Sequence, residues 1–224
     1  MKLRAVAIVP AAGRGKRLGA RVKKPFVLLK GLPLVSYALK ALNSSKYIDA
    51  IIIASERSCV DSFKSLVRQF KLKKVIHIVV GGKTRYDSVR NCLNKMPPSF
   101  DIVLIHDGAR PFLQRSAIKD SIRLAEIAGA CIVAVPETDT VKLVDKGLVI
   151  KKTLDRTRIF RAQTPQAFRR ELIKKAYGRS GRREITDDAS MVEMLGKPVK
   201  IIKGSYRNIK VTTKEDLKLA EVLL

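Results

Sequence analysis

The sequence contains no tryptophan and only three cysteines in 224 residues. Cys59, Cys92 and Cys131 lie far apart, with neither the close spacing of a metal site nor the even number of a disulfide framework. We therefore expect three packed thiols without a chemical role and a reducing, cytoplasmic compartment.

Long hydrophobic runs are also missing. The run 5–9 is broken by Pro10 and followed by basic residues, so it matches neither a signal peptide nor the roughly 20 apolar residues of a membrane span. No membrane association is expected. Hydrophobic residues still make up 46% of the chain, which excludes overall disorder, and the length fits one domain, residues 1–224.

Acidic residues are scarce, with 20 Asp and Glu against 46 Lys and Arg and a formal net charge of +26. Such an imbalance favours a polyanionic partner, which could be nucleic acid, a membrane surface or a phosphorylated small molecule. Aromatic residues, which stack on bases, form only 5% of the chain, and no nucleic-acid-binding module is recognisable. Nucleic acid is therefore the disfavoured partner, although composition alone leaves it open.

Short runs rich in β-branched residues recur along the first 135 residues. Each is too short for a free-standing helix, which favours strands buried on both faces of a sheet. The segments between them have apolar residues three and four apart, a spacing that predicts helices. This alternation predicts an α/β fold with a mostly parallel open sheet flanked by helices, and ligands at the carboxyl ends of the strands. The expected strands are 5–9, 50–54, 75–80, 101–106 and 130–135, and the expected helices are 34–43, 57–70, 84–96 and 116–128.

The pattern changes after Pro136. Two strands flank Asp145, Lys146 and Gly147, a turn signal that predicts a protruding β-hairpin arm over about 137–157. A two-stranded ribbon is only marginally stable alone, so we expect the arm to pack on a second subunit. Helices at 165–178 and 186–195, a strand at 198–203 and a last helix after Thr213 complete the prediction.

The strongest local signal follows the first strand, in the segments PAAGRGKRL at 10–18 and KKP at 23–25. Small residues after a strand let backbone N–H groups approach phosphates, and neighbouring Arg and Lys neutralise their charge. The glycine spacing is that of neither a P-loop nor a dinucleotide-binding motif. The segment is interpreted as a triphosphate-binding loop, and a glycine-rich turn with solvated basic residues is the alternative.

This loop is one of several motifs that follow each other along nearly the whole chain: AAGRGKRL, GLPLVSYAL, GGKTRYDSV, HDGARP, DTVK, LDRTRIFRAQTPQAF, ITDDAS and NIKVT. Together they resemble the 2-C-methyl-D-erythritol 4-phosphate cytidylyltransferases of the non-mevalonate isoprenoid pathway. The resemblance implies a Rossmann-like nucleotidyltransferase fold that transfers a cytidylyl group from CTP to methylerythritol phosphate and releases pyrophosphate. Ribitol 5-phosphate stays open as the acceptor, and a basic nucleic-acid-binding protein is the alternative from another class.

The resemblance also implies roles for individual residues. Arg17 and Lys24 would stabilise the transition state, and Asp107 would hold a magnesium ion, although a lone aspartate after a strand is also a common turn residue. A phosphate nucleophile is already anionic near neutral pH, so the site needs cations rather than an activated serine or cysteine. The implied CTP contacts are Ala11, Ala12, Gly13, Gly15, Gly81, Gly82 and Ser88, and the implied acceptor contacts are Arg110, Thr140, Arg156, Thr164 and Lys210, of which Arg156 and Lys210 also count as catalytic.

In the family the arm crosses to the neighbouring subunit, so the resemblance implies a homodimer in which Thr140 and Arg156 serve the partner's site. Taken alone, Arg156 and Lys210 would be ordinary solvated residues.

Two positions depart from the family's usual pattern. Lys83 stands where the family more often has an acidic residue, and Pro25 stands where many relatives have glutamine. Lys23 also makes the choice of the key lysine ambiguous by one position, and Lys24 is preferred because its spacing from Arg17 matches the family.

Overall fold

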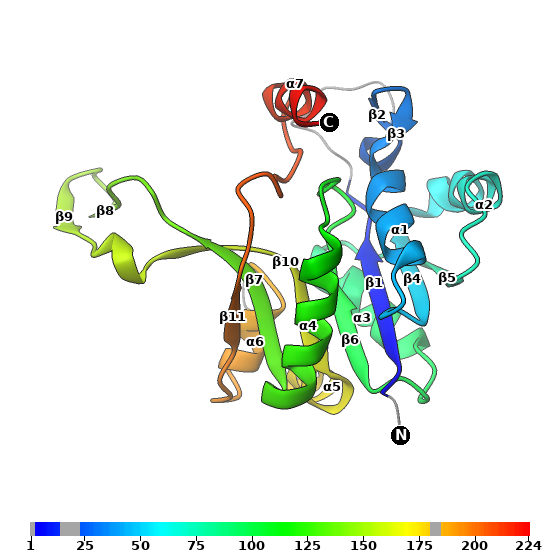
Figure 1. Ribbon diagram of the computed structural model, residues 1–224. Helices are drawn as coiled ribbons and strands as arrows, with labels where there is room; N and C mark the ends of the chain where they lie inside the picture. Colours follow the sequence, from blue (N-terminus) through cyan, green and yellow to red (C-terminus); the bar gives the residue numbers. More distant parts are fainter. Residues whose placement is uncertain (1–2, 14–22, 180–184) are drawn as a thin grey trace.

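The computed structural model describes residues 3–13, 23–179 and 185–224, and within these ranges a seven-stranded sheet forms the centre (Figure 1). β10 runs antiparallel to both of its neighbours. The other neighbouring pairs are parallel, so the predicted mostly parallel α/β sheet is confirmed. In spatial order the strands are β11 (Lys200–Lys203), β7 (Ala130–Pro136), β10 (Phe160–Arg169), β6 (Ile102–Ile105), β1 (Ala5–Pro10), β4 (Ala50–Ser55) and β5 (Val75–Val80).

Helices cover both faces of the sheet because successive strand residues point to opposite sides. Ala5, Ala7 and Val9 of β1 belong to one core cluster, whereas Val6 and Ile8 belong to the other. The first cluster packs against α1 (Leu34–Ser44), α2 (Val60–Gln69) and α4 (Arg115–Ala128), and the second against α3 (Arg85–Lys95), α5 (Arg170–Arg179) and α6 (Ala189–Glu193).

The last helix, α7 (Lys214–Leu223), begins at a capping box in which the hydroxyl of Thr213 accepts a hydrogen bond from the backbone N–H of Asp216. Ala220 of this helix packs with Val27 and Leu29, which lie in and beside the small pair of strands β2 (Leu28–Leu29) and β3 (Leu32–Pro33). The C-terminal segment is thereby tied to the region that follows the first loop.

The expected helix over 165–178 is wrong in its first part. Residues up to Arg169 belong to β10, and only Arg170–Arg179 form α5. β10 fills the space between β6 and β7, where Phe168 pairs with Val103 on one side and Ala130 on the other. The residues up to Arg169 hydrogen-bond to two strands that are distant in the sequence, and this pairing outweighs their helical spacing. No short-range pattern in the sequence reveals such pairing.

The run 75–80 forms a strand as expected, but it is not buried on both faces. β5 lies at an edge of the sheet with β4 as its only sheet neighbour among the described strands, and Ile76 is 41% exposed. An edge position leaves one side of the strand without a partner, which explains the exposure.

The predicted hairpin is present as β8 (Lys142–Val144) and β9 (Ile150–Thr153), and it projects from the sheet (Figure 1). The carboxylate of Asp145 accepts hydrogen bonds from the backbone N–H groups of Gly147 and Val149, which fixes the turn. Large apolar side chains are exposed along this arm, namely Leu143, Val144, Leu148, Val149 and Ile150.

All three cysteines are buried and free of disulfides. Burial raises the pKa of Cys92 and of Cys131 to about 12, so both remain thiols near neutral pH. None of the helices in the described ranges is long and apolar enough to cross a membrane.

Candidate active site

A cavity of about 780 Å³ opens at the carboxyl ends of β1, β4, β5 and β6. This is the edge of a parallel sheet where ligands are expected to bind. Its lining comes from four loops and from the C-terminal segment, and it includes Ala11, Ala12, Gly13, Lys24, Glu56, Gly81, Gly82, Lys83, Arg85, Ser88, Asp107, Gly108, Lys210 and Thr212.

The loop after β1 and the glycine pair after β5 lie against each other. A Cβ atom at Gly81 would lie 2.6 Å from the Cβ of Ala12 and 2.8 Å from the hydroxyl oxygen of Ser88. The backbone N–H of Gly81 donates to the carbonyl of Ser55, which fixes the start of the second loop. Gly81 is therefore required by close approach of two loops.

Ser88 organises the glycine pair from the first turns of α3. Its hydroxyl donates to the carbonyl of Thr84 at 2.9 Å and accepts from the N–H of Gly82 at 3.1 Å. Thr84 and Asp87 form a capping box that begins the helix. The predicted CTP contacts in the described residues, Ala11, Ala12, Gly13, Gly81, Gly82 and Ser88, all line the cavity.

Asp107 is the central carboxylate of the site and is only 6% exposed. Its Oδ1 accepts from Arg85 Nε at 3.1 Å, and its Oδ2 pairs with Lys210 Nζ at 2.8 Å and with Arg110 Nε at 3.8 Å. Burial raises the pKa of Asp107, but the three cations together outweigh it and hold the pKa well below the usual range. Asp107 is therefore ionised at any physiological pH.

His106 and Thr164 support Asp107 from beneath. The hydroxyl of Thr164 accepts the backbone N–H of Asp107 at 3.0 Å and donates to His106 Nδ1 at 3.1 Å, because the neutral ring carries its proton on Nε2, which faces a carbonyl. The Nε2–H of His106 then donates to the carbonyl of Arg110 at 3.1 Å. Burial lowers the pKa of His106 to about 4, so the ring is neutral near pH 7 and fixes the loop 106–110.

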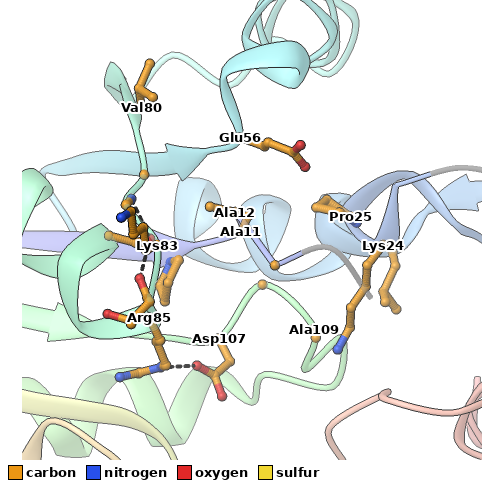
Figure 2. Close-up of a pocket in the computed structure, with 18 of the residues that line it drawn as sticks. Ala11, Ala12, Lys24, Pro25, Glu56, Val80, Lys83, Arg85, Asp107 and Ala109 are labelled. Carbon is orange, nitrogen blue, oxygen red and sulfur yellow. Dashed lines mark hydrogen bonds and ion pairs between the residues drawn. The ribbon is translucent and has the colours of Figure 1, made fainter. Parts of the chain in front are cut away.

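The two adjacent lysines have different surroundings. Lys23 Nζ pairs with Glu56 Oε1 at 2.9 Å, whereas Lys24 lines the cavity. Figure 2 shows Lys24 on one side of the site and Arg85, directed at Asp107, on the other. The structure thus places Lys24, and not Lys23, among the described residues that line the cavity.

Several predicted site residues do not line the cavity within the described part of the chain. Thr164 is buried beneath Asp107, and Arg110 is held by the carbonyl of Asn208 at 2.6 Å. Thr140 precedes the arm strands, and Arg156 lies after them, where its Nη1 donates to the carbonyl of Thr138 at 2.8 Å. Gly15 and Arg17 lie outside the described residues.

Sequence reasoning assigned no role to Arg85 or Asp188. Arg85 Nη2 donates to Asp188 Oδ2 at 2.7 Å while its Nε contacts Asp107. Burial lowers the pKa of Arg85, but the two aspartates outweigh it and raise the pKa above its usual range. Both residues lie in motifs already quoted, GGKTRYDSV and ITDDAS, but their separation of 103 residues hid the contact.

The described residues at the cavity could hold a divalent cation only together with oxygens of a bound substrate. No group of three or more His, Cys, Asp or Glu side chains that could hold a metal occurs in the described ranges. Asp107 supplies one hard carboxylate at the cavity, and Mg²⁺ commonly binds through one or two carboxylates plus substrate phosphates and water. The donor set therefore suits magnesium carried on a triphosphate.

Comparison with known proteins places this site in a family. The model of the IspD family, 2-C-methyl-D-erythritol 4-phosphate cytidylyltransferase, matches residues 5–224. The chain belongs to this cytidylyltransferase family. The family consists of enzymes, and neither ribitol 5-phosphate transfer nor nucleic-acid binding is favoured by the match.

Curated relatives named 2-C-methyl-D-erythritol 4-phosphate cytidylyltransferase extend the family match over the full length. The one from Syntrophus aciditrophicus is 43% identical and covers 100% of this chain and 97% of its own. The one from Pelotomaculum thermopropionicum is 41% identical, with 97% and 93% covered.

Solved structures of the family share the fold. The 4-diphosphocytidyl-2C-methyl-D-erythritol synthase of Anaerococcus prevotii has a TM-score of 0.89 at 30% identity and covers 98% of this chain and 95% of its own. The family member from Francisella tularensis has a TM-score of 0.81 at 31% identity, with 99% and 100% covered.

Proposed function

We propose that the cavity binds CTP and transfers its cytidylyl group to 2-C-methyl-D-erythritol 4-phosphate, with release of pyrophosphate. The observation that carries this proposal is the buried carboxylate of Asp107, surrounded by Arg85, Lys210 and Arg110 beside two loops of small residues. Such a site supplies concentrated positive charge for two phosphorylated substrates that repel each other.

The nucleotide is expected to lie between the two small-residue loops. Ala11, Ala12 and Gly13 leave backbone groups accessible after β1, and the glycine pair 81–82 does so after β5. The hydroxyl of Ser88 holds the second loop in place through Gly82. Lys83 adds a cation at the same wall, so its contribution would be electrostatic.

Magnesium is the proposed metal, with Asp107 as its protein ligand. When bound, it would neutralise charge on the triphosphate and polarise its oxygens. Lys210 and Arg85 keep Asp107 ionised and fix its orientation, and His106 and Thr164 hold the backbone beneath it.

The reaction needs no proton transfer to begin. An oxygen of the acceptor phosphate attacks the α-phosphorus of CTP, and the bond from that phosphorus to the bridging oxygen breaks as pyrophosphate leaves. Lys24 lines the cavity and would stabilise the charge of this transition state together with Arg17. Lys210 and Arg110 would hold the acceptor phosphate, and Thr164 would support the loop 106–110 through the backbone N–H of Asp107.

The arm is proposed to complete the site of a second subunit. Five large apolar side chains are exposed on it, Leu143, Val144, Leu148, Val149 and Ile150, which is the pattern of a surface that another chain covers. Thr140 and Arg156 lie at the base of this arm. A homodimer would bring them to the partner's cavity.

We place this enzyme in the cytoplasm because its three buried cysteines are all free thiols.

Product identification tests the proposed reaction type. With CTP, Mg²⁺ and methylerythritol phosphate, phosphorus NMR should show pyrophosphate together with the two coupled resonances of a new diphosphodiester. Formation of CMP without a coupled pair would mean hydrolysis rather than transfer. Formation of CDP would mean attack at a different phosphorus.

A further inference from the structure

Arg85 divides one edge of its guanidinium between two aspartates. The Nε–H of Arg85 donates to Asp107 Oδ1 at 3.1 Å, and its Nη2 donates to Asp188 Oδ2 at 2.7 Å. These two nitrogens form the fork that normally grips both oxygens of a single carboxylate. Here Asp107 receives only one of the two bonds, and its Oδ2 faces Lys210.

Asp188 is held rigidly away from the cavity. It is 0% exposed and is not among the described residues that line the cavity. Its Oδ1 accepts from the hydroxyl of Tyr177 at 2.6 Å, and its backbone N–H donates to Gln166 Oε1 at 3.1 Å. The ring of Tyr177 is itself stacked on Tyr86, with centroids 4.9 Å apart. Asp188 is therefore kept from the cavity, whereas its partner Arg85 lines it.

We infer that Asp188 is a positioning residue: by holding Nη2 of Arg85, it prevents Arg85 from gripping both oxygens of Asp107, so that Oδ2 stays directed at the cavity, where it pairs with the partly exposed Lys210. The inference rests on the proposed function, in which the cation of the nucleotide would replace Lys210 at that oxygen.

The alternative arrangement is chemically favourable, which is why a second aspartate matters. A bidentate arginine–carboxylate pair gives two parallel charge-assisted hydrogen bonds. Without the negative charge of Asp188, Nη2 of Arg85 would lose its charged partner in a mostly buried position. Asp107 is the other carboxylate that Arg85 already contacts. Lysine at position 85 could not form this bidentate pair.

The test measures the affinity of the enzyme for Mn²⁺ in the presence of CTP by electron paramagnetic resonance. It compares the effect of Asp188→Asn in two backgrounds. In the otherwise native chain the variant should weaken Mn²⁺ affinity about tenfold, and its crystal structure without metal should show Arg85 bonded to both oxygens of Asp107. In the Arg85→Lys background the same change should weaken affinity less than twofold.

Controls separate positioning from general loss of structure. Asp61→Asn removes the same charge from an exposed side chain and should leave Mn²⁺ affinity unchanged. If Asp188→Asn does not fold, Tyr177→Phe keeps the ring stack, loosens Asp188, and should weaken affinity two- to threefold in the same direction. Equal losses in both backgrounds, or an unchanged Arg85–Asp107 geometry, would overturn the inference alone. Absence of CTP-dependent Mn²⁺ binding in the native chain would overturn the proposed function as well.

Discussion

At the scale of single residues, Lys23 and Lys24 differ in what they contact. The Lys23–Glu56 pair is partly exposed, and such pairs contribute about 0–1 kcal/mol to stability. Lys24→Ala should lower kcat about 100-fold or more while weakening CTP binding much less, because a cation aimed at developing charge acts mainly in the transition state. Lys23→Ala is the matched control and should retain near-normal kcat. The reverse pattern would transfer the role to Lys23.

The buried His106 is expected to make the stability of the protein depend on pH. Its pKa is about 4 in the folded protein, and a free histidine titrates near 6.5, so the unfolded chain binds the extra proton between these values. The stability that His106 contributes is complete above pH 6.5 and is lost as the pH falls toward 4, by about 2 to 3 kcal/mol. Urea unfolding at pH 7 and 4.5 should show a smaller pH dependence for His106→Asn than for the native chain. Equal dependence in both would contradict this assignment.

The sequence predicts some of the site's residues but not all of the contacts between them. Asp107, Lys24 and Lys210 were expected at one site, and the structure brings all three to the cavity. The Arg85–Asp188 pair was not expected, because the bond joins residues far apart in the chain, and neither residue carries a local signal for it.

At the scale of elements, the contact between the loops after β1 and β5 decides the shape of the nucleotide half of the cavity. Gly81→Ala would place a methyl group against Ala12 and Ser88, so we expect a loss of about 1–3 kcal/mol in stability and a raised KM for CTP. Gly13→Ala is the control for stability, because a Cβ at Gly13 meets nothing within 4 Å among the described atoms. Equal melting temperatures for the two variants would show that the loops separate easily.

The elements that sequence predicted well are those with local causes. The Asp145–Gly147 turn marked the hairpin, and Thr213 with Asp216 marked the beginning of α7. The last part of β10, residues 165–169, is wrongly predicted as helix because its place depends on β6 and β7, which flank it in the sheet but not in the sequence. That strand also carries Thr164, whose contact with the backbone N–H of Asp107 the sequence did not predict.

For the whole molecule, the site accounts for some of the positive residues behind the net charge of +26 and leaves the others without an explanation. Lys24, Lys210, Arg85 and Arg110 lie in or beside the site, and their charge matches two phosphorylated substrates. Most other basic residues in the described part of the chain lie outside the cavity, and nothing in the structure explains their excess.

The proposed dimer can be tested by mixing two inactive variants. Lys24→Ala disables a site through its own chain, whereas Arg156→Ala disables the partner's site if the arm crosses over. Random reassociation of equal amounts in a two-fold dimer should restore about a quarter of native activity, because half of the dimers contain one intact site of two. No recovery after verified subunit exchange would mean that Arg156 serves its own chain or that no shared site forms.

The choice of acceptor separates methylerythritol phosphate transfer from ribitol 5-phosphate transfer. Pyrophosphate release should be measured with saturating CTP and Mg²⁺ while methylerythritol phosphate and ribitol 5-phosphate are varied separately. We predict a kcat/KM at least 100-fold higher for methylerythritol phosphate, since a site built to bind an acceptor's polar groups discriminates strongly against the wrong one. A higher kcat/KM for ribitol 5-phosphate, or no CTP-dependent release with either, would contradict the account.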